Sequence, residues 1–391
     1  MTTVDRWLLP DGIEEVLPAQ AQKIEKLRRQ LLNLYGSWGY QLVIPPLMEF
    51  TESLLIGLDS DIDLLTFKVT DQLSGRTMGI RADITPQVAR IDAHSMPTEG
   101  VARLCYAGSV LHTRQKSLLA SRSPMQLGAE LYGVTSIEAD IEVISLMLET
   151  LSASGLEKIT LDLGHVGIYR TLLADSGLSV EQEGLLFDAL QRKSSVDLEQ
   201  ILADIDQQIT GEWLLALSHL HGDSSVLDKA AVMFSAGPEK ALQAVRELQA
   251  VAEAVKLRVP GVELYFDLSE LRGYHYHTGI VFAAYVPGYG HALANGGRYD
   301  HVGEVFGRAR PATGFNTDLK ALVALLNASA DSIEQTAAIS APASGDEAML
   351  TMVSALRSQG ETVIARITEE VDKRCNRELV LSDGHWQIES L

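Results

Sequence analysis

A long block of helical sequence separates two strand-rich regions of this chain. Leu, Ala, Gln and Glu recur at helical spacing over about residues 165–258. Short strand signals precede this block within residues 39–132, and they return after it within residues 262–300. The block is therefore interpreted as an all-helical insertion into an α+β core.

The first strand-rich region alternates short strands with helices. Its first helix has Pro18 in a position suited to the first turn, and Gly36 is the expected C-cap. The expected elements are a helix over 18–35, a strand over 39–46, a hairpin from 65–70 and 77–81, a helix over 84–93, a strand–loop–strand unit over 103–132 and a helix over 136–152.

The second region is followed by a change in composition. Residues 328–345 are rich in Ser, Ala, Pro, Gly and Asp, which indicates a boundary. We therefore predict a core domain over residues 1–328 and a small α/β domain over residues 329–391. The remaining expected elements are strands over 262–267, 279–285 and 291–295, a helix over 317–328, a strand over 337–340, a helix over 346–358, a strand over 362–367 and a hairpin around the turn at 382–385.

The charge of the chain is strongly acidic. Its 391 residues include 52 Asp and Glu against 32 Lys and Arg, which gives a formal charge of −20. Such a chain repels phosphate backbones unless it has a local basic groove. We therefore expect neither a nucleic-acid partner nor docking on an anionic membrane.

Several other protein classes are disfavoured by simple patterns. The two cysteines, Cys105 and Cys375, lie far apart, which argues against a disulfide scaffold or a cysteine-based zinc site and fits a reducing compartment. The first residues lack the pattern of a signal peptide, and no apolar run approaches the ~18 residues of a membrane span. We expect a soluble cytoplasmic protein.

Four segments concentrate polar residues within strand-like or turn-like sequence: residues 81–87, 126–130, 271–279 and 296–300. Gln126 and Glu130 are four apart on a predicted strand, so both side chains point to the same face. An amide and a carboxylate on one face suit the binding of an amino group. The alternative is a solvated face, which spacing alone favours because such residues are mostly exposed.

The segment from Arg272 to His277 alternates tyrosine and histidine. His275 and His277 are candidate metal ligands, but a site also needs a third ligand and an orienting second shell, and no metal spacing is present nearby. Structural histidines or a pocket wall are the alternatives, and we predict no metal site. The chain also lacks a phosphate-binding GxxxxGK[ST] loop, a GxGxxG turn and a GxSxG elbow. Spacing alone predicts a small-molecule pocket in an α+β protein.

Taken together and in order, these segments resemble the core of class II aminoacyl-tRNA synthetases, specifically histidyl-tRNA synthetase, over about residues 8–328. Residues 11–18 look like the family's N-terminal entry, residues 39–49 like its dimer-forming motif 1, and residues 103–133 like motif 2. Residues 272–279 are similar to the histidine-specific segment, and residues 296–315 to the lead-in to motif 3. The resemblance implies a six- or seven-stranded antiparallel sheet flanked by helices.

The departures from the synthetase pattern concern the nucleotide. Where the family has an arginine for the ATP α-phosphate, this chain has His112, and where it has an acid that contacts adenine, this chain has Arg114. In motif 3 the acid and the nucleotide-binding arginine are replaced by Lys320 and Ala321. Arginine supplies a permanently charged donor fork for phosphate, whereas histidine is at best partly charged near pH 7. We therefore expect ATP activation to be lost.

The amino-acid side of the resemblance is better kept. The positions that contact histidine in the synthetase correspond here to Asp83, Thr85, Gln126, Glu130, Arg272, Tyr276 and His277, with His277 in place of a tyrosine. The tail is short, and from Asp331 onward it holds eleven acids against five Lys and Arg. Such a unit is a poor binder of tRNA. The pattern suggests sensing of histidine without adenylation.

A synthetase-like core with these losses resembles the regulatory subunits of ATP phosphoribosyltransferase. The resemblance implies a non-catalytic subunit without a cofactor that activates a short catalytic partner for the first step of histidine biosynthesis and takes part in feedback inhibition by L-histidine. It also implies a homodimer within a hetero-octamer of four regulatory and four catalytic chains. The alternatives are an active histidine–tRNA ligase and another ATP-activating synthetase paralogue.

Overall fold

The structure is a computed structural model that describes residues 7–55, 60–97, 99–115, 120–174, 176–203, 208–274, 276–329 and 337–391. The chain divides into two compact units, Met1–Ala328 and Ser329–Leu391. Among the described residues, no helix has both the length and the apolar character needed to cross a membrane.

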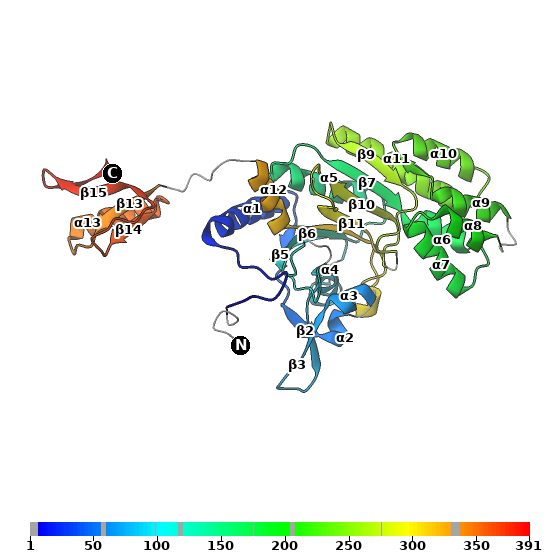
Figure 1. Ribbon diagram of the computed structural model, residues 1–391, viewed down its shortest axis with the longest axis horizontal. Helices are drawn as coiled ribbons and strands as arrows, with labels where there is room; N and C mark the ends of the chain where they lie inside the picture. Colours follow the sequence, from blue (N-terminus) through cyan, green and yellow to red (C-terminus); the bar gives the residue numbers. More distant parts are fainter. Residues whose placement is uncertain are drawn as a thin grey trace. The chain divides into compact units, whose positions relative to one another are not determined.

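A nine-stranded sheet forms the centre of the larger unit, as far as its residues are described (Figure 1). Its spatial order is β1 (Gln41–Leu42), β5 (Ala102–Ser109), β6 (Met125–Tyr132), β12 (Ala312–Asp318), β11 (Ala294–Arg298), β10 (Ile280–Tyr285), β7 (Thr160–His165), β9 (Glu263–Asp267) and β8 (His221–Gly222).

The sheet is mixed and larger than the expected six or seven antiparallel strands. Most neighbouring strands are antiparallel, but β1 pairs with β5 and β7 pairs with β9 in parallel. Parallel neighbours need a long crossover connection. The whole helical insertion lies between β7 and β9, so it provides the crossover that returns the chain in the same direction.

Successive residues of a strand point to opposite faces of the sheet, so the two faces bury different side chains. On β6, Leu127, Ala129 and Leu131 belong to the main hydrophobic core, which also contains residues of α1 (Pro18–Ser37), α5 (Glu138–Ala153) and α11 (Glu239–Arg258). Tyr132 faces the other way and packs in a second cluster with Ile84 of the segment that leads into α4 (Thr85–Arg90). Long helices therefore cover one face, and α4 lies on the other.

The first helix forms as its periodicity predicts. Its buried residues, Ile24, Leu27, Leu31 and Tyr35, recur every three or four positions. The expected C-cap is wrong, because α1 continues through Gly36 to Ser37. The left-handed position is taken by Gly39, whose φ is +83°.

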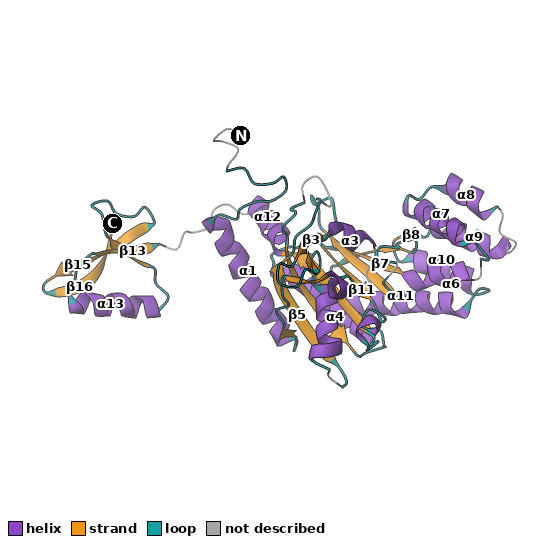
Figure 2. Cartoon of the chain, turned by 90° about the horizontal axis from the view of Figure 1, so that it is seen from below, coloured by secondary structure: helices purple, strands orange, loops and turns teal. Residues whose placement is uncertain are grey.

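The helical insertion is confirmed over the described residues. It comprises α6 (Val166–Ala174), α7 (Val180–Gln191), α8 (Ser195–Leu202), α9 (Gln208–Leu217), α10 (Ser225–Phe234) and α11, with the two-residue strand β8 between α9 and α10. These helices gather at one end of the sheet, next to β7 and β9 (Figures 1 and 2).

A small antiparallel sheet and several short elements complete the larger unit. The predicted hairpin is confirmed as β3 (Phe67–Thr70) and β4 (Thr77–Ile80), and β2 (Met48–Phe50) pairs with β4. The other elements are α2 (Thr51–Leu54), α3 (Ser60–Leu65), the π-helical turn η2 (Ile91–Ser95), the 3-10 turn η3 (Glu304–Phe306) and α12 (Leu319–Ser329).

The smaller unit is a four-stranded sheet with one helix. The order is β14 (Val363–Arg366), β13 (Ala338–Pro342), β15 (Cys375–Ser382) and β16 (His385–Ser390), and α13 spans Glu347–Ser358. The predicted hairpin is confirmed, since Asp383 and Gly384 adopt φ of 49° and 76°, as a type I′ turn requires. The unit has its own core, which includes Ile339, Val353 and Leu379.

Candidate functional site

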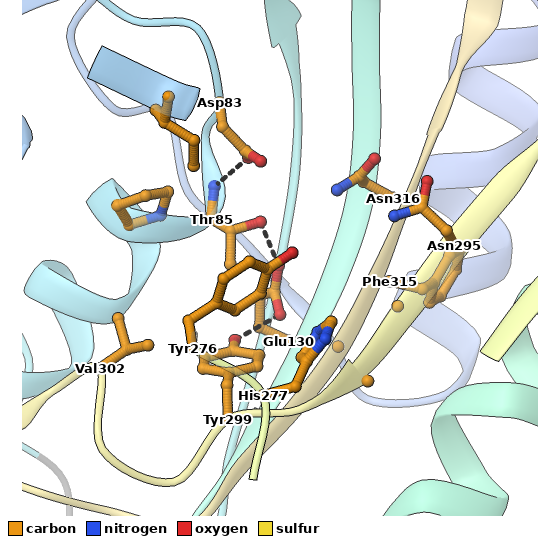
Figure 3. A pocket seen from close by; sticks show the side chains of 15 residues that line it. Asp83, Thr85, Glu130, Tyr276, His277, Asn295, Tyr299, Val302, Phe315 and Asn316 are labelled. Atoms are coloured by element: carbon orange, nitrogen blue, oxygen red, sulfur yellow. Dashed lines mark hydrogen bonds between the residues drawn. The ribbon is translucent and has the colours of Figure 1, made fainter. Parts of the chain in front are cut away.

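A cavity opens where α4, β6, β11 and β12 meet (Figure 3). Five of the predicted histidine-contacting residues line it: Asp83, Thr85, Glu130, Tyr276 and His277. The other lining residues are Ile62, Pro86, Asn295, Gly296, Gly297, Tyr299, Val302, Gly314, Phe315 and Asn316.

Glu130 lies at the centre of a cluster of hydroxyl groups on the cavity wall. Only 1% of the residue is exposed. Its Oε1 accepts hydrogen bonds from the hydroxyls of Thr85 and Tyr106, each at 3.1 Å. Its Oε2 accepts a third bond, of 2.5 Å, from the Tyr299 hydroxyl. The carboxyl is thus held in one orientation by three donors, and Figure 3 shows the bonds from Thr85 and Tyr299.

Burial is the main influence on this carboxyl. It raises the pKa of Glu130 to about 8, and the nearby Asp83 carboxylate adds to the rise, although the hydroxyl donors lower it. The group therefore gains or loses its proton close to neutral pH. A ligand that brings a cationic or N–H donor group to Glu130 would favour the ionised form.

Asp83 and Gln126 form a second polar pair beside Glu130. Asp83 Oδ1 accepts hydrogen bonds from Gln126 Nε2 at 3.0 Å and from the Thr85 amide at 2.9 Å. Gln126 Oε1 in turn accepts one from the Ile84 amide at 2.8 Å. Gln126 thus stands behind Asp83 and fixes its carboxylate. The alternative of a solvated face on this strand is wrong, because Gln126 and Glu130 are both buried.

His277 contributes a neutral imidazole to the wall. Its Nδ1 lies 3.1 Å from the Arg272 carbonyl oxygen, which only accepts hydrogen bonds, so Nδ1 carries the proton and Nε2 is an acceptor. Burial lowers the pKa of His277 to about 4, which agrees with a neutral ring. The Tyr276 ring lies beside it, with the ring centroids 4.2 Å apart.

The metal alternative for this segment gains no support in the described part of the chain. His275 lies outside the described residues. Among those that are described, no group of three or more His, Cys, Asp and Glu side chains is placed to hold a metal ion.

Arg272 does not line the main cavity. Its guanidinium donates from Nη2 to Glu270 Oε2 at 3.0 Å and to the Tyr285 hydroxyl at 3.1 Å. Arg272 and Glu270 border a second cavity, which shares His277, Asn295 and Gly296 with the first. The two cavities are therefore neighbours, separated by the His277 side chain and strand β11.

The four positions that depart from the nucleotide pattern lie outside both cavities. His112 is buried, and its Nε2 lies 3.0 Å from the Ala82 carbonyl oxygen. Arg114 is exposed, and Ala321 packs against the main core. Lys320 donates from Nζ to Ser123 Oγ at 3.2 Å and to Glu14 Oε1 at 3.4 Å.

The sequence analysis missed both of the tyrosines that donate to Glu130, Tyr106 and Tyr299. Tyr299 lies in a segment that was singled out, yet no role was assigned to it. Tyr106 lies on β5 next to β6, where strand pairing sets Tyr106 opposite Gly128. The adjacent Arg298 turns away from the pocket and ties β11 to α5 through a buried ion pair with Asp140, with Nη2 and Oδ2 2.7 Å apart.

Two family models match this chain, one in each of its two units. A family model described as histidyl-tRNA synthetase matches residues 12–322. A second, described as the C-terminal domain of the ATP phosphoribosyltransferase subunit HisZ, matches residues 336–389.

Solved structures show the same fold. One from Bacillus halodurans, titled an ATP phosphoribosyltransferase regulatory subunit/histidyl-tRNA synthetase, is 27% identical with a TM-score of 0.81 and covers 94% of this chain and 95% of its own. A histidyl-tRNA synthetase from Nostoc is 19% identical with a TM-score of 0.77 over 98% and 97% of the two chains.

Full-length relatives are closer. A protein from Ectopseudomonas mendocina is 55% identical over 396 residues, and one from Thioalkalivibrio sulfidiphilus is 53% identical over 397 residues. Both matches cover 100% of each chain, and both relatives are named ATP phosphoribosyltransferase regulatory subunit. The expected class II synthetase-like fold is thus confirmed, and the chain belongs to the family of ATP phosphoribosyltransferase regulatory subunits.

Proposed function

We propose that this chain is the non-catalytic regulatory subunit of an ATP phosphoribosyltransferase in histidine biosynthesis. It activates a separate, short catalytic subunit for the first step of the pathway, and it takes part in feedback inhibition by histidine. Its full-length relatives carry the corresponding name. Activation is a population shift, in which contact with this chain favours the active form of the partner.

One contrast within the core supports this proposal most directly. The polar cluster around Glu130 is complete, with three hydroxyl donors on one buried carboxyl. At two positions where a synthetase holds phosphate by arginine, this chain has His112, whose ring faces a backbone carbonyl, and Ala321, which packs against the core. Charge stabilisation of this kind is usually the largest catalytic contribution. The site therefore suits binding of the amino acid and not its activation.

We place L-histidine in the main cavity. Asp83 and Glu130 offer carboxylates to its N–H groups, with Thr85 and Gln126 in support, and His277 offers an acceptor through Nε2. The described residues that line this cavity include no Lys or Arg. The ligand carboxylate therefore points toward the second cavity, where Arg272 supplies the nearest guanidinium on the wall.

The assembly is also part of the proposal. The chain forms a homodimer through residues 39–49, within a cytoplasmic hetero-octamer of four regulatory and four catalytic chains that binds no tRNA. The short strand β1 is an edge of the sheet. Leu42 of this strand and Ile44 and Leu47 after it are 46%, 80% and 49% exposed, and apolar edges of this kind call for a covering partner.

The proposal is tested with the chain and the short catalytic subunit together. We expect phosphoribosyl transfer to require both chains, and we expect calorimetry to show L-histidine binding that a Glu130→Ala substitution weakens at least tenfold. Light scattering of the mixture should give the mass of the hetero-octamer. Histidine-dependent exchange between ATP and pyrophosphate by the chain alone would contradict a non-catalytic role. Unchanged histidine affinity in Glu130→Ala would place the ligand elsewhere.

A further inference from the structure

We propose that an ion cluster behind the pocket couples histidine binding to the helical insertion. The cluster consists of Asp162, Lys193, Asp267, Glu270 and Arg272. This inference rests on the proposed function, since it concerns how histidine binding in the main cavity affects the helical insertion of the same chain. It assigns Lys193 and Glu270 as positioning residues that do not themselves touch the ligand.

The cluster joins the pocket wall to the insertion by direct contacts. Arg272 pairs with Glu270, with Nη2 and Oε2 3.0 Å apart. The Glu270 amide donates to the Asp267 carbonyl oxygen at 3.1 Å, so the two acids lie on one tight turn. Asp267 Oδ2 then pairs with Lys193 Nζ at 2.6 Å, and Lys193 follows α7 of the insertion. A continuous path thus leads from the second cavity to the end of α7.

Asp162 shows that the cluster is short of positive charge. Its Oδ1 is buried and has no hydrogen-bond partner among the described residues, which is uncommon for a carboxylate oxygen. Burial, together with the nearby Asp267 and Glu270 carboxylates, raises the pKa of Asp162 to about 7. Arg272 and Lys193 act on it in the opposite sense. Three acids therefore share two bases.

Lys193 holds an unusual backbone conformation at its end of the path. Its φ is +51°, and the turn is closed by hydrogen bonds from the Lys193 and Ser194 amides to carbonyl oxygens of α7. Glycine is the usual residue at such a helix end, because a side chain is strained there. The long side chain of Lys193 nevertheless reaches back to the sheet and pairs with Asp267.

The consequence of ligand binding follows from the charge count. Among the described residues that line the main cavity, none is Lys or Arg, so the ligand carboxylate competes with Glu270 for Arg272 of the second cavity. Once Arg272 turns to the ligand, the three acids are left with Lys193 alone. Lys193 is then held more firmly, and the turn after α7 becomes more rigid.

Because coupling between two sites is reciprocal, the competition of Glu270 and the ligand for Arg272 predicts changes in histidine affinity. Because coupled sites usually change each other's affinity about fivefold or more, we expect Glu270→Gln, which loosens the hold on Arg272, to strengthen histidine binding about fivefold. Lys193→Met should weaken it about fivefold, since Arg272 is then the only base in the cluster. Lys193→Arg, which restores the charge, should bind histidine like the unaltered chain.

Arg192→Met is the matched control. Arg192 precedes Lys193 in the chain, but its ion pair with Asp197, with Nη2 and Oδ2 3.3 Å apart, stays within the insertion. Its loss should leave histidine affinity unchanged. Binding is measured by calorimetry on the complex with the catalytic subunit, and thermal unfolding of each variant checks that it is folded.

Hydrogen exchange gives the second readout. In the unaltered complex, L-histidine should slow amide exchange at the end of α7 and the start of α8 about fivefold. Lys193→Met should abolish this slowing even at saturating histidine, whereas Arg192→Met and Lys193→Arg should retain it. A merely structural role of Lys193 would change exchange equally with and without the ligand.

The outcomes separate the two proposals. If histidine binds but Glu270→Gln and Lys193→Met both bind it like the unaltered complex, the ion-cluster route is wrong and the pocket stands. If the unaltered complex binds no histidine, the proposed pocket is wrong and the route falls with it. The route would also be overturned if L-histidine still slowed amide exchange at the end of α7 and the start of α8 in Lys193→Met.

Discussion

At the scale of single residues, Glu130 shows how burial changes the chemistry of a common side chain. Glutamate is mostly exposed in proteins, and the spacing of Gln126 and Glu130 alone favoured a solvated face. In the structure Glu130 is 1% exposed and receives three hydroxyl donors. The donors stabilise the anion, but the cost of burial is larger, so the pKa of Glu130 rises to about 8.

The raised pKa of Glu130 predicts that this single residue makes the free energy of unfolding depend on pH. Because the pKa is higher in the folded chain than the ordinary value of 4.5, stability from this group is complete below about pH 4 and is lost as the pH rises toward 8. Glu130→Gln removes the titration. We therefore expect the ligand-free variant to gain stability relative to the unaltered chain between pH 5 and pH 8, by on the order of a few kcal/mol.

Chemical denaturation at several pH values measures this difference. Glu253→Gln, on an exposed position of α11, controls for the loss of one acid from an acidic chain. A difference between Glu130→Gln and the unaltered chain that stays constant from pH 5 to pH 8 would mean that Glu130 does not titrate in this range.

The sequence indicates which residues surround Glu130 better than it indicates where each side chain lies. Asp83, Thr85, Tyr276 and His277 line the main cavity. Arg272 does not, because its direction depends on Glu270 and Tyr285, and no spacing along the chain encodes those contacts. Tyr106 and Tyr299 were missed for a related reason, since strand pairing brings β5 and β6 together and the cluster spans both sides of the insertion.

At the scale of secondary-structure elements, β12 and β7 are two of the strands that the sequence analysis missed. Strand β12 contains Gly314, Asn316 and Asp318, which are poor strand formers, and its pairing with β6 and β11 compensates for them. Strand β7 is short and borders the helical block, although Leu161 and Leu163 alternate with polar residues as a strand requires. The hairpins and α1 were predicted correctly because local periodicity and turn residues determine them.

Gly314 illustrates why β12 tolerates a poor strand former. A Cβ atom built at Gly314 would overlap the Glu130 carboxylate, so any larger residue must displace it. We predict that Gly314→Ala weakens histidine binding more than tenfold and destabilises the fold by about 1–3 kcal/mol, the usual cost of overpacking.

Calorimetry with L-histidine and chemical denaturation test this prediction. Gly290→Ala is the control, because a Cβ there would meet no atom within 4 Å. Equal histidine affinity in Gly314→Ala and Gly290→Ala would show that the position of the Glu130 carboxylate does not govern binding.

At the scale of the whole molecule, the chain is strongly acidic and divides into two compact units. The formal charge of −20 opposes tRNA binding, and the smaller unit carries eleven acids against five bases from Asp331 onward. That unit matches its own family model over residues 336–389 and has its own hydrophobic core. Each unit therefore has the ingredients of a separate fold.

Separate cores predict separate unfolding transitions in the intact chain. The smaller unit has few core residues, and domains of this size are marginally stable, so we expect it to melt first. Leu379→Ala opens a cavity in its core and should lower only this transition, with a loss of about 2–5 kcal/mol. Leu146→Ala, in α5, should lower only the other transition. Scanning calorimetry of the full chain distinguishes the two. A single transition that both substitutions shift would show that the two cores stabilise each other, and the chain would then unfold as one cooperative body.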